Sequence, residues 1–151
     1  MMPYAIALHA LAALVWVGGM FFAYMALRPA AGALSPEARL PLWVATLRRF
    51  FAWVWAAVLI LPLTGYWMVS SYFGGMGHVG ASVYIMQVLG WIMILLFLHV
   101  YFAPFRRLRK LTESGDYPAA ARQLNQIRLL VGINLSLGLI VVAVAAGGMY
   151  F

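Results

Sequence analysis

The sequence predicts an all-α integral membrane protein, a bundle of four transmembrane helices, and two observations lead to that prediction. The ten basic and three acidic residues all fall within residues 28–49 and 106–128. The other stretches are apolar, and 66% of the chain is hydrophobic, well above the usual share in a soluble domain. Since one crossing takes roughly 20 apolar residues, each outer stretch holds one span and the longer middle stretch, 50–105, holds two.

The predicted spans form a single domain over residues 1–151 and cover about residues 4–27, 50–72, 82–103 and 129–150. At about 1.5 Å per residue, each span can cross a hydrocarbon core of roughly 30 Å. A cleavable signal peptide is the alternative for the first span, since Ala31-Gly32-Ala33 resembles a cleavage site. We expect the first span to be retained. No basic residue precedes it, and its apolar run is longer than the hydrophobic region of a signal peptide.

The basic residues predict the orientation of the bundle. Segments 28–49 and 104–128 hold four and six Arg or Lys residues, whereas the connection at 73–81 holds none. Positively charged loops stay in the cytoplasm, so we expect both termini outside (N-out/C-out). Nucleic acid is not an expected partner, because the basic residues flank apolar spans and would meet anionic lipid.

Helix-start signals in the charged segments predict that the helices extend into the cytoplasm. Ser35-Pro36-Glu37 offers an N-cap, a proline at the first helical position and an acid in the first turn. We expect a short helix there that breaks near Pro41. Asp116 or Tyr117 should begin a helix that runs into the fourth span, and the third span should extend past Pro104.

Polar and small residues within the spans predict how the helices meet. Pro62 is expected to kink the second span, with the Thr64 hydroxyl bonding the carbonyl that the proline frees. Three polar residues should face inward as hydrogen-bonding groups: Gln87, Asn134 and Ser136. Small residues expected at close helix contacts include Gly18, Gly19 and Gly132.

His9 is the first candidate site residue, because an ionisable side chain is costly inside a membrane span and usually marks a functional site. Its helical neighbours Ala5, Ala12 and Ala13 are small and leave room beside the imidazole for a flat macrocycle or another helix. Trp16 lies two turns along the same face. This pattern fits a histidine that is hydrogen-bonded within the bundle, and it also fits a ligand or a residue that handles protons.

His99 lies near the cytoplasmic end of the third span, at a depth similar to that of Arg128. It is either an interfacial histidine or a second ligand or substrate contact on the inner side. At 1.5 Å per residue, His9 lies about 7 Å and His99 about 25 Å below the outer surface. Two trans ligands of one metal sit roughly 4 Å apart, given bonds of about 2 Å, so these two histidines cannot share a metal.

The outer loop at residues 73–80 holds four glycines and the pair Met76-x-His78. A thioether and an imidazole are soft donors that suit Cu(I). This loop is therefore either the outer part of a copper site or a plain apolar connection.

Most catalytic constellations are excluded. Without cysteine there is no disulfide, no thiolate metal site and no haem held through Cys-x-x-Cys-His. The three acids lie in the charged segments and cannot form an acid/base pair inside the membrane. We expect no catalysis unless a bound haem supplies oxidoreductase chemistry.

The run from Leu8 to Phe22, with His9, Trp16 and Gly18-Gly19, resembles the first helix of the CopD-like (copper resistance D) membrane proteins. The later runs, 99–108 and 124–128, are similar to the compact four-helix branch of that family. That branch also resembles the HemJ-type membrane proteins, which are associated with b-type haem and protoporphyrinogen oxidation. The resemblance implies a bacterial inner-membrane protein tied to copper handling or a haem-binding relative, with His9 as a ligand in either case.

Two functional hypotheses follow, and a structural or assembly subunit is the third. In the first, Met76, His78 and His9 form an outer-side Cu(I) entry in a protein that binds or passes copper. In the second, a b-type haem redox protein, His9 is an axial ligand. The cofactor-binding candidates are His9, Trp16, His99 and Arg128. Expected partners are the lipid bilayer, a metal ion and a periplasmic copper protein, and homo-oligomerisation is left open.

The orientation can be tested with reporter fusions. Alkaline phosphatase fused at Gly75 should be active, because that loop is expected outside, whereas a fusion at Gly115 should be inactive. Activity at Gly115 combined with silence at Gly75 would reverse the orientation and with it the outer position of His9.

Overall fold

The computed structural model describes residues 2–75, 77 and 79–148, and over those residues it contains helices and connecting loops but no strands. Four helical stretches are long and apolar enough to cross a membrane: Met2–Ala31, Pro36–Ser71, Ala81–Glu113 and Tyr117–Gly147. The chain is therefore an all-α, multi-pass membrane protein, as the sequence predicts. Its lipid-facing surface is apolar, with many large hydrophobic side chains exposed.

Each crossing is built from one or more helical elements. The first contains α1 (Met2–Phe22), the π-helical segment η1 (Ala23–Leu27) and α2 (Arg28–Ala31). The second contains α3 (Pro36–Met68) and the π-helical segment η2 (Val69–Phe73). The third contains α4 (Ala81–Phe102) and α5 (Pro104–Glu113), and the fourth is α6 (Tyr117–Gly147).

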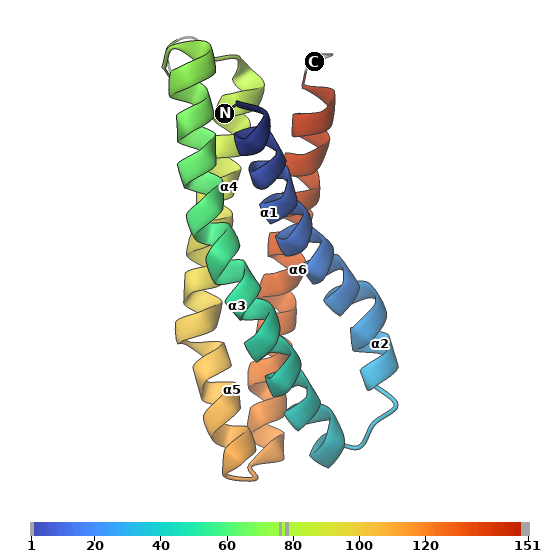
Figure 1. Cartoon of the computed structure of the whole chain (residues 1–151). Helices are drawn as coiled ribbons and strands as arrows, with labels where there is room; N and C mark the ends of the chain where they lie inside the picture. Colours follow the sequence, from blue (N-terminus) through green and yellow to red (C-terminus); the bar gives the residue numbers. More distant parts are fainter. Residues whose placement is uncertain (1, 76, 78, 149–151) are drawn as a thin grey trace.

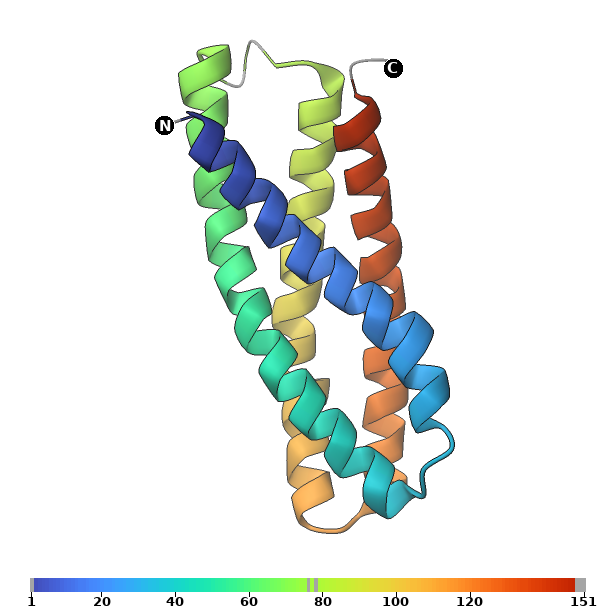
Figure 2. The same cartoon turned by 45° about the vertical axis from the view of Figure 1, so that its right-hand side comes forward.

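The four crossings form an elongated bundle (Figure 1). The start of α1, the end of α6 and the connection from η2 to α4 lie together at one end, which we call the terminal end. The turns from α2 to α3 and from α5 to α6 lie at the other, here the charged end. Figure 2 shows α1 crossing the bundle obliquely, and it packs chiefly on α3, while α6 packs on α4 and α5.

The start of α3 follows the predicted signals, but the predicted break near Pro41 is wrong. Ser35 is extended, Pro36 occupies the first turn with Glu37, and the helix then continues through Pro41 and Pro62. A proline removes the bond to the carbonyl four residues earlier, and for Pro41 that carbonyl belongs to Glu37 in the exposed first turn. The loss is small there, since buried Leu40 and other core residues hold the helix on both sides.

The other two predicted helix starts are confirmed. Asp116 caps α6, since its side chain accepts a hydrogen bond from the backbone N–H of Ala119 at 3.3 Å. Gly115 precedes it with a φ of 79°, a conformation that favours glycine. The third crossing continues past Pro104 as α5 after an interruption at Ala103, whose φ is −117° and ψ −88°.

Aromatic side chains in the middle of the bundle and toward its charged end connect α1, α3, α4 and α5. Phe51 lies edge-on to Phe97 and Phe105, with ring centroids 5.5 and 5.0 Å apart, and Trp16 lies edge-on to Phe97 at 6.3 Å. Tyr101 also packs in this group. Such edge-to-face pairs are favourable beyond the area they bury. We call Trp16, Phe51, Phe97, Tyr101 and Phe105 the aromatic core.

Polar residues in the spans bond to backbone, though not always as expected. Buried Asn134 donates from Nδ2 to the Met93 carbonyl at 3.3 Å, which confirms its inward position. Ser136 is exposed and donates to the carbonyl one turn earlier, so its predicted inward position is wrong. Pro62 removes the usual donor to the Val58 carbonyl. The Thr64 hydroxyl does not replace that donor, because it donates to the Ile60 carbonyl at 2.7 Å.

Gly19 allows a close contact between α1 and α3. A β-carbon added there would overlap the ring of Phe50, whereas one added at Gly18 would meet no atom within 4 Å. Only the second glycine of the pair is therefore needed for helix packing.

The substitution Gly19→Ala should lower the free energy of unfolding by about 1–3 kcal/mol, because the Phe50 ring must move aside. Gly18→Ala is the matched control, and it should be neutral or slightly stabilising, since alanine favours helix over glycine. Thermal unfolding of the purified variants in detergent measures both. Equal melting temperatures for the two variants would contradict this account of the contact.

Candidate functional site

A cavity of about 370 Å³ lies between α1, α3, α4 and α6 in the half of the bundle nearer the terminal end. Its volume is within the range of roughly 300–1,000 Å³ that is usual for small-molecule sites. Apolar side chains form most of its lining, and His9, Tyr66 and Gln87 add polar groups. We call it the His9 cavity.

The imidazole of His9 is held by α3. Its Nδ1 lies 2.7 Å from Thr64 Oγ1. The Thr64 hydroxyl has one hydrogen and donates it to the Ile60 carbonyl at 2.7 Å, so it accepts from His9. We infer that Nδ1 carries the ring proton and that Nε2 keeps its lone pair.

Nε2 is the free coordinating atom of this ring. Among the described residues it has no hydrogen-bond partner, and the ring itself lines the cavity. A neutral imidazole whose second nitrogen donates to an oxygen is the usual state of a histidine that binds a metal. Thr64 supplies that oxygen here, which makes it a positioning residue for His9.

Small residues give the ring its space, although they are not all on its own helix. Ala13 lines the cavity, whereas Ala5 and Ala12 are buried. Gly65 of α3 also leaves room for the ring, because a β-carbon added there would lie 3.3 Å from His9 Cε1. A larger residue at position 65 would press on the imidazole.

Three methionines line the same cavity as His9: Met68 from α3, and Met86 and Met93 from α4. Thioether and imidazole groups together make a soft donor set. Within the part of the chain that the structure describes, no group of three or more His, Cys, Asp or Glu residues is placed to hold a metal. Any metal site here would thus depend on thioethers, and hard cations would find few ligands.

A hydrogen-bonded polar group lines the cavity between α3 and α4. The Tyr66 hydroxyl oxygen accepts hydrogen bonds from Gln87 Nε2 at 2.6 Å and from Trp91 Nε1 at 2.9 Å. Gln87 is half-buried and lines the cavity. Trp16 of the aromatic core also lines the cavity, and its ring contacts Phe97.

The remaining candidates lie elsewhere or outside the described residues. His99 is exposed near the end of α4 and does not line the His9 cavity. Arg128 lines a separate small pocket toward the charged end. Met76 and His78 lie outside the described residues, in the connection at the terminal end. The cavity methionines and Thr64 were not grouped with His9 from the sequence, since no local pattern joins them.

Comparison with known protein families gives a match over most of the chain. A family model described as copper resistance protein D (CopD) matches residues 44–147, which include most of α3 and all of α4, α5 and α6. Thr64 and the three cavity methionines fall inside the matched stretch, and His9 precedes it. Searches among curated proteins and among solved structures gave no match.

The tautomer of His9 is directly measurable. In protein labelled with ¹⁵N-histidine and studied in detergent at alkaline pH, the His9 signals, identified by their loss in His9→Ala, should show a protonated Nδ1 and a bare Nε2. Thr64→Val should change the tautomer ratio roughly fivefold toward Nε2–H, since one hydrogen bond worth about 1 kcal/mol is lost. Thr64→Ser should keep the wild-type ratio, and a wild-type ring protonated at Nε2 would contradict the assignment.

Proposed function

Because the chain belongs to the copper resistance protein D family, we propose that it is an inner-membrane protein that binds Cu(I) in the His9 cavity as part of copper uptake or tolerance. The observation that carries this proposal is the donor set: His9, with Nε2 free, lines one intramembrane cavity with Met68, Met86 and Met93. Copper is the cargo of this site.

The charge of the donor set suits a monovalent ion. Imidazole and thioether ligands are neutral, and no acidic residue lies in the apolar stretches 1–27, 50–105 and 129–151. A bare charge in an apolar medium is costly, and the cost rises steeply for a divalent ion without anionic ligands. Neutral soft donors therefore favour Cu(I) over Cu(II), Zn(II) or Mg(II).

Copper would enter from the terminal end. The connection between η2 and α4 lies there (Figure 1) and carries Met76 and His78 in sequence. We propose that these two residues take the ion from the periplasm, or from a periplasmic copper protein, and deliver it to His9.

The packing below the cavity favours a binding protein over an open channel. The aromatic core lies between the His9 cavity and the charged end, and Phe51, Phe97 and Phe105 are almost completely buried. Met20 of α1 is buried as well. Passage of copper to the other side would require these rings to move.

A b-type haem is the second candidate, because the cavity is larger than a single ion needs. The described lining fits a haem less well. It offers one histidine and no Arg or Lys to meet the propionates, and His99 lies elsewhere. The test below therefore also records the visible spectrum.

Titration of the purified protein in detergent with Cu(I), against a chromophoric competitor under reducing conditions, tests the proposal. The wild type should bind Cu(I) at the His9 cavity. His9→Ala and Met86→Leu should each weaken binding about tenfold or more, a loss of about 1.4 kcal/mol or more. His99→Ala and Met25→Leu are the matched controls, since both residues are exposed away from the cavity, and both should bind as the wild type does.

Two results would overturn the copper proposal. One is a wild type without Cu(I) affinity, and the other is a His9→Ala variant that binds as tightly as the wild type. A purified protein with a Soret band that disappears in His9→Ala would assign the cavity to haem instead.

A further inference from the structure

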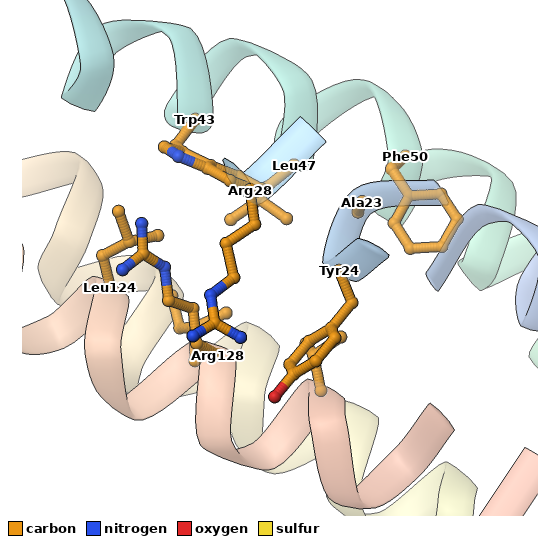
Figure 3. A pocket seen from close by; sticks show the side chains of 10 residues that line it. Ala23, Tyr24, Arg28, Trp43, Leu47, Phe50, Leu124 and Arg128 are labelled. Atoms are coloured by element: carbon orange, nitrogen blue, oxygen red, sulfur yellow. The ribbon is translucent and has the colours of Figure 1, made fainter. Parts of the chain in front are cut away.

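The His9 cavity has more space than the proposed copper ion needs. Metal–ligand bonds are about 2 Å long, whereas the cavity measures about 370 Å³, the size of a site for a small organic molecule. The pocket toward the charged end (Figure 3) differs, since its free space of about 20 Å³ holds no more than one water-sized group. Of these two pockets, only the His9 cavity can take an organic ligand.

The lining of the His9 cavity suits a neutral and lipophilic ligand. Apolar side chains form most of it, and none of the lining residues that the structure describes is Asp, Glu, Lys or Arg. A charged organic group placed there would lose its hydration without gaining a counter-ion, which is costly. A neutral molecule that dissolves in the bilayer does not have that cost.

Gly90 of α4 leaves open space on the cavity side of its helix. A β-carbon added there would meet no atom within 4 Å. Residues three or four positions to either side of it also line the cavity: Met86, Gln87, Met93 and Ile94. Position 90 therefore lies in the middle of the face that α4 presents to the cavity. The aromatic side chains Trp16, Tyr66 and Trp91 line the cavity as well, and such rings pack well on a flat ligand.

The hydroxyl of Tyr66 offers one unused hydrogen-bond donor. Its oxygen accepts from Gln87 Nε2 and from Trp91 Nε1, so its own hydrogen is available to another acceptor. Among the described residues, none receives that hydrogen. Bilayer hydrocarbon contains no acceptor either. A ligand with a carbonyl oxygen would complete this hydrogen-bonded group.

The same hydrogen-bonded group forms the side of the cavity between α3 and α4. Among the described residues, α3 packs chiefly on α1 and α4 chiefly on α6. Side chains, and not closely packed backbones, therefore bridge α3 and α4 beside the cavity. Tyr66 and Trp91 line the cavity and are also exposed, so a wall of side chains separates the cavity from the bilayer here. A lipid-soluble molecule would have its shortest way in between these two helices.

We propose that the His9 cavity binds a flat, neutral, membrane-soluble carbonyl compound of the quinone class, which enters between α3 and α4. Quinones combine the properties that the lining suits, since they are uncharged, planar and lipophilic and carry ring carbonyls. One carbonyl oxygen accepts the free hydrogen of Tyr66, and the ring fills the space in front of Gly90. This binding uses none of the proposed copper donors, so it can be tested without copper.

Thermal unfolding of the copper-free protein in detergent, with added decylubiquinone, tests the proposal. A compound that binds the folded state raises the melting temperature in a concentration-dependent way. Gly90→Leu fills the cavity, and it should need about tenfold or more decylubiquinone for the same rise. Gly18→Leu is the matched control, because position 18 has open space too but does not line the cavity. It should respond as the wild type does.

Tyr66→Phe provides a second, milder test, because it keeps the ring and removes only the hydroxyl. It should weaken the response to decylubiquinone about fivefold, since one hydrogen bond is lost. Decylbenzene, which has a ring and an alkyl chain but no carbonyl, should act equally on the wild type and on Tyr66→Phe.

Equal responses of Gly90→Leu and Gly18→Leu to decylubiquinone would overturn the site. If Gly90→Leu does not fold, a Tyr66→Phe variant that responds to decylubiquinone as the wild type does would overturn it instead. Decylbenzene acting on the wild type as strongly as decylubiquinone would overturn the carbonyl ligand and assign the cavity to hydrocarbon chains.

Discussion

The hydrocarbon of a bilayer supplies no hydrogen-bond partner and no counter-ion, and this constraint organises the whole molecule. Backbone groups must pair within helices, which is why the described residues form four helical crossings. Charged side chains are excluded from the apolar stretches and gather in two segments. Some polar side chains that remain inside bond to backbone, as Asn134 does to Met93 and Thr64 to Ile60. Others bond to side chains of another helix, as Gln87 does to Tyr66.

The most informative polar atoms are those without a hydrogen-bond partner among the described residues, because lipid cannot supply that partner. Nε2 of His9 is one, and Thr64 holds the ring so that this nitrogen stays bare. Among the described residues, Trp43 Nε1, Arg128 Nε and Asn134 Oδ1 are buried without a partner as well. The His9 nitrogen differs from these three, since its lone pair lies beside thioethers and suits a soft cation.

The sequence predicts the helices well, because their positions depend on local signals. These signals are the placement of the charged residues, the helix start at Ser35-Pro36 and the cap at Asp116. It fails at Pro41, where tertiary burial of Leu40 outweighs a local breaker. Which residues of different helices meet is not predictable in the same way. Spans that are apolar on all sides carry no pattern that marks an inner face, so the contact of His9 with Thr64, 55 residues apart, is invisible in the sequence.

Charge also bears on the direction in which a cation could leave the His9 cavity. The net charge of +7 is carried by the two charged segments, so a cation leaving the cavity toward the charged end would meet a positive potential. Among the described residues, Arg28 and Arg128 have no carboxylate partner at that end, and opposition from such charges is strong where water is scarce. This field and the buried aromatic rings would therefore both oppose passage of a cation to the charged end.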